Sequence, residues 1–162
     1  MVSQIFDPLG IIGPVIPRAK LLLQQLWREK LSWDETVPLC IFTSFIQFYK
    51  EILSISDIKI PRHILLINYQ EITVHGFCDA SISAYGACVY LVSRDSTGTR
   101  QSQLLCAKSR VAPLKTVTLP RLELCGALLL ANLIKQVLDA LSLNISPIFY
   151  WTDYYCPCLA TF

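Results

Sequence analysis

The first 65 residues carry apolar side chains at helical spacing. Over residues 18–31, leucines and a tryptophan recur at three- and four-residue intervals among charged and amide residues, which predicts an amphipathic helix. Aromatic and aliphatic residues repeat in the same way from residue 37 or 38 to about residue 54, which predicts a second helix. The run Ile60-Pro61-Arg62 breaks this pattern, so we expect residues 1–65 to form a helical segment that ends there.

From residue 71 the period changes to the alternation that is typical of strands. The expected elements are strands at 71–79, 85–92 and 102–109, a long apolar helix at 120–141 and a last strand at 147–152. Small and turn-forming residues at 80–83 and 93–100 predict hairpin loops, so the first three strands should form an antiparallel meander. Because a helical crossover precedes the last strand, that strand should lie parallel to a partner. The order β-β-β-α-β predicts an α/β fold with a mixed sheet.

The composition excludes disorder and membrane spans. Hydrophobic residues make up 53% of the 162 residues and charged residues 16%, which is below the usual share of about 25%. Mean hydropathy is high, at +0.46. The longest uncharged runs, 36–49 and 124–134, are nevertheless shorter than the roughly 18 residues that a membrane helix needs. No secretory signal is visible at the start of the sequence, so we expect an intracellular protein, cytoplasmic or nuclear.

Tryptophans and cysteines are expected to serve packing. Trp27 and Trp33 should pack the helical segment, and Trp151 should belong to a core strand. The seven cysteines lie mostly in apolar stretches, which is typical of buried thiols in a reducing compartment. A metal-thiolate site at Cys156-Pro157-Cys158 is disfavoured because zinc sites usually combine two cysteine pairs, and no second pair is present.

Three acids in apolar surroundings are the main candidates for chemistry. Asp79 ends the first predicted strand and Asp153 ends the last, so their carboxylates should meet if the two strands are parallel neighbours. Glu123 shares the sheet-facing side of the long helix with aliphatic residues, near its first turn. Three converging carboxylates without a matching cation repel one another unless divalent ions compensate, which favours Mg²⁺ or Mn²⁺. The alternative is structural, with the aspartates capping turns and Glu123 favouring the helix N-terminus.

A basic stretch lies between the strands and the long helix. From Arg94 to Arg121 the chain carries six basic residues against the single acid Asp95, a local net charge of +5. Phosphate backbones favour such concentrations of charge because lysine and arginine displace condensed counterions. A solvated basic loop is an equally acceptable interpretation. Four of the six are candidates for contact with nucleic acid: Lys108, Arg110, Lys115 and Arg121.

Several motifs in combination resemble the ribonuclease H region of a retrotransposon polyprotein. They are Gly76-Phe77-Cys78-Asp79-Ala80-Ser81, Tyr85-Gly86-Ala87, Leu119-Pro120-Arg121-Leu122-Glu123-Leu124 and Tyr150-Trp151-Thr152-Asp153. The opening Ile5-Phe6-Asp7-Pro8-Leu9-Gly10 and the helix with Trp27 look like the segment that joins reverse transcriptase to ribonuclease H in the Pao/BEL group of LTR elements. The resemblance covers nearly the whole chain.

The resemblance implies a ribonuclease H-like fold in which Asp79, Glu123 and Asp153 match the family's first three metal-binding acids. In that family such acids bind Mg²⁺ for hydrolysis of the RNA strand of an RNA–DNA hybrid. It also implies a helical reverse-transcriptase connection segment at 1–65, a ribonuclease H-like domain at 71–162, and neighbouring Pol polyprotein domains as partners. The four basic candidates would then contact phosphates.

The sequence departs from the family after Asp153. Only nine residues follow that acid, where the family continues with a helix, a strand and a fourth acidic or histidine ligand. We therefore expect a domain truncated at its C-terminus, with weak or no turnover. The alternative is a non-catalytic nucleic-acid-binding or assembly fragment of the polyprotein with the same fold.

Aspartic peptidase activity is a third interpretation, because Pao-type regions are also grouped with retroelement peptidases. A retroviral-type peptidase needs Asp-Thr/Ser-Gly on a loop between apolar strands. The nearest stretch is Asp95-Ser96-Thr97-Gly98, where the glycine comes one residue late and Arg94 and Arg100 crowd the aspartate. The sequence disfavours this chemistry.

Overall fold

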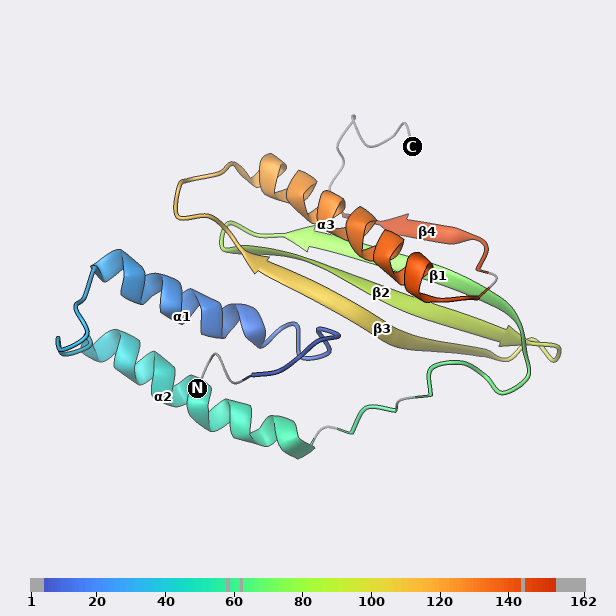
Figure 1. Ribbon diagram of the computed structural model, residues 1–162, viewed down its shortest axis with the longest axis horizontal. Helices are drawn as coiled ribbons and strands as arrows, with labels where there is room; N and C mark the ends of the chain where they lie inside the picture. The colour runs from blue at the N-terminus through green and yellow to red at the C-terminus, as the bar shows by residue number, and fades with distance from the viewer. Residues whose placement is uncertain (1–4, 58, 62, 144, 154–162) are drawn as a thin grey trace.

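The computed structural model describes residues 5–57, 59–61, 63–143 and 145–153, as a mixed α/β arrangement (Figure 1). Along the chain the elements are α1 (Ile16–Glu29), α2 (Leu39–Leu53), the short 3₁₀ helix η2 (Ser54–Asp57), β1 (Tyr69–Ala80), β2 (Ala84–Asp95), β3 (Arg100–Val111), α3 (Leu119–Ala140) and β4 (Ile148–Trp151). The predicted β-β-β-α-β order is confirmed. The predicted truncation concerns residues 154–162, which lie outside the described residues.

The four strands form one mixed sheet in the order β3-β2-β1-β4. The chain from β1 to β3 is the predicted antiparallel meander, and β4 pairs parallel to β1. In the parallel pair, Phe77 lies opposite Trp151. Both strands therefore run toward the same end of the sheet, which positions the residues that follow them.

The second hairpin loop is shorter than the sequence predicted, because β2 continues to Asp95 and β3 starts at Arg100. The Asp95 carboxylate accepts hydrogen bonds from the backbone N–H groups of Thr97 and Thr99, each at 2.9 Å. Gly98 adopts a left-handed conformation with φ 88°, which lets the chain reverse within four residues. These local hydrogen bonds let β2 and β3 continue past the strand ends that hydrophobic alternation predicts.

Helix α3 covers one face of the sheet and forms the core with it (Figure 1). Alternate residues of β1 and β2 point toward the helix and are buried, as the period of two requires. Gly76 provides the closest approach, since a Cβ there would lie 2.6 and 2.7 Å from methyl groups of Ile134 and Leu130. The core consists of Ile72, Val74, Cys78, Ala87, Val89, Leu91, Cys106, Leu129, Leu130, Leu133, Ile134 and Val137.

Helix α1 packs beside the outer strand β3, and α2 packs against α1. Helices α1 and α2 contact each other, and an Arg18–Glu51 ion pair joins them. The side chain of Gln24 on α1 donates to the carbonyl of Ala112, just beyond β3, at 2.7 Å. No helix in the described part of the chain has the length and apolar character needed to cross a membrane.

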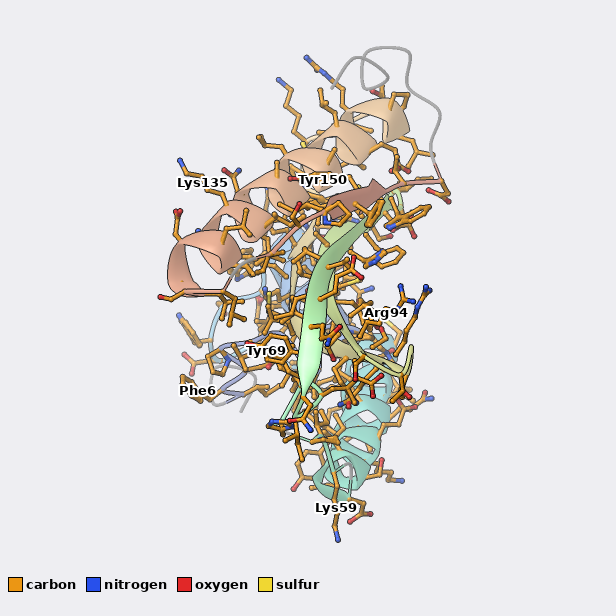
Figure 2. All side chains as sticks on the ribbon, turned by 90° about the vertical axis from the view of Figure 1, so that its right-hand side faces the viewer. Phe6, Lys59, Tyr69, Arg94, Lys135 and Tyr150 are labelled. Carbon is orange, nitrogen blue, oxygen red and sulfur yellow. The ribbon has the colours of Figure 1, made fainter. Side chains whose placement is uncertain are left out.

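The face of the sheet opposite α3 carries a cluster of rings. His75 stacks on Phe149 with ring centroids 4.8 Å apart, and Phe77 stacks on Trp151 at 6.2 Å. Trp151 also donates its indole N–H to Nδ1 of His75 at 3.2 Å. Figure 2 views the sheet along its edge, with Lys135 on the outer side of α3 and Arg94 on the side away from that helix.

The expectation for the three tryptophans is wrong. Trp27 and Trp33 are 71% and 103% exposed, so neither packs the helical segment. Trp151 is 49% exposed and lies in the ring cluster on the open face rather than in the core. Helical periodicity places Trp27 on the apolar stripe of α1. It cannot show whether another element covers that end of the stripe, and the described residues leave Trp27 exposed.

The cysteines are only partly buried. Cys78 and Cys106 lie in the core, Cys88 and Cys125 are half-buried, and Cys40 is exposed on α2. All five are free thiols, as predicted. The pair Cys156 and Cys158 lies outside the described residues.

Candidate metal centre

Asp79 and Asp153 come together because β1 and β4 are parallel neighbours. The last paired residues, Phe77 and Trp151, each precede one of the two aspartates by two positions. The two acids thus occupy equivalent places at the carboxyl ends of adjacent strands, as the sequence predicted. The Asp79 carboxylate accepts a hydrogen bond from the backbone N–H of Ala80 at 2.7 Å, which fixes its position at the strand end.

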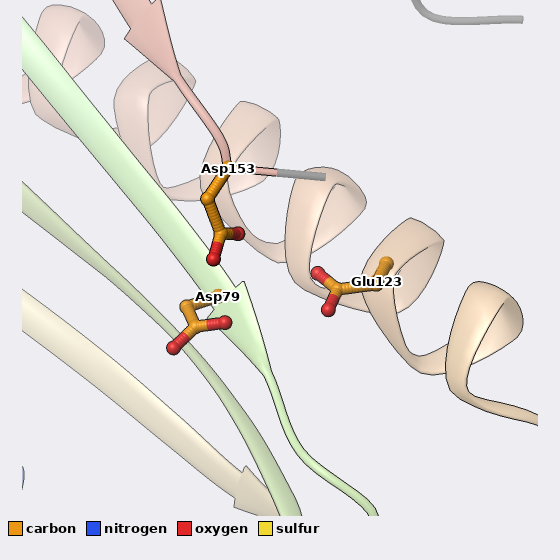
Figure 3. A group of neighbouring side chains, drawn as sticks. All are labelled: Asp79, Glu123 and Asp153. Atoms are coloured by element: carbon orange, nitrogen blue, oxygen red, sulfur yellow. The ribbon is translucent and has the colours of Figure 1, made fainter. Parts of the chain in front are cut away.

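Glu123 reaches the same place from α3 (Figure 3). It is the fifth residue of that helix, near the first turn as the sequence predicted, and it faces the sheet with 7% of its surface exposed. Gly126, one turn further on, lies on the strand ends, where a Cβ would be in ordinary contact at 3.5 Å from the carbonyl oxygen of Asp79. A helix N-terminus interaction does not explain a carboxylate that is turned inward in this way.

The three carboxylates converge, with one ligand oxygen from each acid within 4.8 Å of the others. Oε2 of Glu123 is buried and has no hydrogen-bond partner among the described residues. Burial raises the pKa of Glu123, and the charges of Asp79 and Asp153 raise it further. A buried carboxylate oxygen facing two like charges is costly unless a cation neutralises it.

The thiol of Cys78 lies beside this cluster but is not activated by it. Burial raises the pKa of Cys78, and the negative charges of Glu123, Asp79 and Asp153 add to that effect. The thiol is therefore not activated as a nucleophile. The group that could hold a metal ion consists of the three acids, which offer oxygen donors.

The donor set fits a hard divalent cation. Three carboxylate oxygens of this spacing can share a metal ion, and the exposure of Asp79 and Asp153 leaves one side of the cluster open to water or substrate. The orphaned oxygen of Glu123 is the atom that such an ion would satisfy. Divalent cations of this kind are held by carboxylates together with substrate phosphates.

A hollow of about 730 Å³ on the open face of the sheet ends at the two aspartates. Of the four basic candidates, Lys108 alone lines this hollow, from β3. Arg110 lies two residues further along β3, Lys115 lies in the loop after it, and Arg121 lies in the first turn of α3. All four side chains are exposed, and within the described part of the chain none of them forms an ion pair.

The stretch that resembles a peptidase motif serves as a turn. The carboxylate of Asp95 is exposed and accepts hydrogen bonds from Thr97 and Thr99 within its own hairpin. The Thr97 side chain and the neighbouring backbone N–H groups lower the pKa of Asp95. This local network accounts for the aspartate without a catalytic role.

The sequence analysis missed one wall of the hollow. Five residues between Gly10 and Pro17, before and at the start of α1, line it. The Asp-Pro-Leu-Gly run at 7–10 signals a turn, but it carries no information about where that turn docks. The ring cluster was also missed, because His75, Phe77 and Trp151 come from strands whose pairing has to be known first.

Comparisons with known proteins place these features in context. The family model described as the Pao retrotransposon-like RNaseH-like domain matches residues 1–154. The chain is similar to a solved foamy viral protease-reverse transcriptase dRH in complex with double-stranded DNA, with 15% identity, a TM-score of 0.46, and coverage of 97% of this chain and 27% of that one.

A second solved structure is a foamy viral protease-reverse transcriptase in complex with double-stranded DNA. It has 13% identity and a TM-score of 0.31, and the match covers 95% of this chain and 28% of that one. The chain thus spans roughly a quarter of the length of both viral proteins. Among curated proteins none matches it.

Proposed function

The chain belongs to the family of Pao retrotransposon RNase H-like domains, and from that premise we propose that it binds RNA–DNA hybrids and hydrolyses the RNA strand with the help of divalent metal ions. Asp79, Glu123 and Asp153 hold the metal, Mg²⁺ or Mn²⁺, and bring it to the scissile phosphate. Lys108 contacts a neighbouring phosphate of the hybrid, since it lines the hollow that ends at the carboxylates.

The observation that carries this proposal is the buried, unpartnered Oε2 of Glu123 facing two further carboxylates. A protein gains no stability from such an arrangement by itself, because desolvation and like-charge repulsion both oppose it. A cation reverses both effects. The unfavourable free energy of this arrangement in the metal-free protein therefore indicates a preformed metal-binding site.

Each of the three acids contributes a metal ligand from a different element of the fold. A divalent metal supplies Lewis acidity at a phosphoryl oxygen and generates a nucleophile from water at neutral pH. Asp79 and Asp153 contribute ligand oxygens from two strand ends whose relative position is fixed by sheet pairing. Glu123 contributes its oxygen from α3 and is the buried member, so its orientation is the most restricted of the three.

The test is cleavage of a labelled RNA–DNA hybrid by the purified chain in the presence of Mn²⁺ or Mg²⁺, compared with the Asp79→Asn variant. The matched control is Asp139→Asn, an exposed acid on α3 that lies about 24 Å along the helix from Glu123. We expect weak cleavage by the wild type and by the control, and its loss in Asp79→Asn.

Two results would contradict the proposal in different ways. Equal cleavage by Asp79→Asn and wild type would show that the activity does not come from this cluster. A folded wild type that binds the hybrid but cleaves nothing would remove hydrolysis and leave the alternative of a nucleic-acid-binding module.

A further inference from the structure

The hollow beside the carboxylates is built from two distant parts of the chain. Its floor and one side come from the sheet and from the strand ends that carry Asp79 and Asp153. Its other side is the segment from Gly10 to Pro17, which we call the N-terminal wall. The wall ends at Pro17 and the lining part of the sheet begins at Phe77, so their meeting is a property of the fold.

The N-terminal wall is fixed to the sheet by specific contacts. The carboxylate of Asp7 accepts hydrogen bonds from the backbone N–H groups of Ile11 and Ile12 at 2.9 and 3.0 Å, which shapes the loop. The N–H of Ala107 on β3 donates to the carbonyl of Leu9 at 2.7 Å. The residue just before the wall is therefore bonded to the free edge of β3, where the N–H of Ala107 would otherwise be unpaired.

Gly10 makes this close docking possible. Its φ is +70°, a left-handed conformation that side chains disfavour, and a Cβ there would lie only 1.8 Å from the backbone carbonyl oxygen of Ala107. Backbone cannot yield as a flexible side chain can. Any residue other than glycine at this position must push the wall off β3.

The position of the hollow beside the carboxylates, more than its mainly apolar lining, points to an anionic polymer as its occupant. It is continuous with the carboxylate cluster through Asp79 and Asp153. A cation bound there to the buried oxygen of Glu123 would also bind a phosphate. Lys108 adds a positive charge to its lining. Gly13, Gly86 and Ala107 are among the lining residues, and side chains this small let a sugar-phosphate chain approach the backbone closely.

We propose that the N-terminal wall is part of the nucleic-acid-binding surface and contacts the hybrid strand next to the scissile phosphate. The proposal rests on the function proposed above and extends it, because it assigns binding to a segment outside the ribonuclease H motifs. Affinity for the hybrid then depends on a piece of chain that precedes α1.

The main test places charges on the wall at Ile11, which lines the hollow and is only partly exposed. Ile11→Glu, Ile11→Gln and Ile11→Lys are made in the Asp79→Asn background, so that no hybrid is consumed. Dissociation constants for a fluorescent RNA–DNA hybrid are measured by anisotropy at several salt concentrations. The same three substitutions at Leu128, which is exposed on α3 and does not line the hollow, form the matched control.

We expect binding to weaken in the order Lys, Gln, Glu, by about threefold per step near 0.1 M salt, where the screening length is about 10 Å. From Gln to Lys, the slope of log affinity against log salt should steepen by about one. The Leu128 series should show no such order. Three equal affinities in the Ile11 series, with the parent protein binding the hybrid, would overturn the proposal while leaving the proposed function intact.

A second pair of variants tests the docking itself. Gly10→Ala and Gly98→Ala both place alanine at a left-handed position, but only the former meets backbone on β3. Gly10→Ala should expose the N–H of Ala107 to hydrogen exchange and weaken hybrid binding at least about threefold, whereas Gly98→Ala should change neither. Loss of protection at Ala107 with unchanged hybrid affinity would also overturn the proposal. Absence of hybrid binding by the parent protein would overturn both this proposal and the proposed function.

Discussion

Replacing Glu123 by glutamine removes one charge from the carboxylate cluster and keeps the shape of the side chain. In metal-free buffer at pH 7 we expect Glu123→Gln to be more stable than the wild type. The buried carboxylate has two like charges in front of it and an oxygen without a described partner. An amide at the same place can donate hydrogen bonds to Asp79 and Asp153 instead of repelling them.

The size of the effect follows from the geometry. Two unit charges 4.8 Å apart, the span of the cluster, repel by about 1 kcal/mol in bulk water and by about 3.5 kcal/mol at an effective dielectric constant near 20. Glu123 has two such neighbours, both exposed, so the lower part of this range applies to each. Protonation limits the total, because adding a proton to a glutamate of ordinary pKa at pH 7 costs about 3.5 kcal/mol. The expected gain is about 2–3 kcal/mol, or roughly 4–10 °C in Tm.

The pH dependence has a definite sign. Burial and the neighbouring aspartates raise the pKa of Glu123 in the folded protein, so the folded state keeps this proton to higher pH than the unfolded state does. Wild-type stability therefore falls as the pH rises from the ordinary glutamate pKa through the raised one. The stability difference between Glu123→Gln and wild type should be small below about pH 4 and should reach its full size above the raised pKa.

The assay is thermal unfolding in EDTA from pH 4 to pH 8, with Asp139→Asn as the control for removing an exposed charge from the same helix. Adding Mn²⁺ should then stabilise the wild type more than Glu123→Gln, because a ligand stabilises the state that binds it. If Glu123→Gln melts at or below the wild-type temperature in metal-free buffer at pH 7, the repulsion inferred from the geometry is absent.

Three more predictions concern the core, the thiols and the basic strand. Gly76→Ala should destabilise the protein by about 1–3 kcal/mol in urea unfolding, because its Cβ meets α3 side chains at 2.6 and 2.7 Å, whereas Gly86→Ala, with its nearest contact at 3.5 Å, should not. Burial raises the pKa of Cys106 to about 11, so mass spectrometry after iodoacetamide treatment at pH 8 should find Cys40 labelled and Cys106 unlabelled, and equal labelling would contradict this. Arg110→Ala should weaken hybrid binding and flatten its salt dependence by about one unit of slope, and an unchanged slope would exclude contact with phosphate.

Much of the fold was predictable because the hydrophobic periods are clear. The strict alternation along 71–79 and the long apolar run at 120–141 reflect one sheet face and one helix stripe that bury each other. The ends of β2 and β3 were not predictable in the same way. They depend on the hydrogen bonds of Asp95 within its turn, which hydrophobicity does not report.

The candidate site was predictable where it depends on strand topology. A helical crossover before the last strand implies a parallel pairing, and that pairing brings Asp79 and Asp153 together. Helical periodicity alone turns Glu123 inward. The N-terminal wall was not predictable, because its position rests on one backbone hydrogen bond to Ala107 and on the space beside Gly10, and neither has a sequence signature.

The most direct test of the central claim is calorimetric titration of Mn²⁺ into the wild type, Asp79→Asn and the Asp139→Asn control at one pH. The account predicts saturable binding by the wild type and the control, and an affinity lower by about tenfold or more in Asp79→Asn, which lacks one of three ligands. Identical binding curves for the wild type and Asp79→Asn, or no saturable binding by the wild type, would contradict the claim that these carboxylates form a metal site.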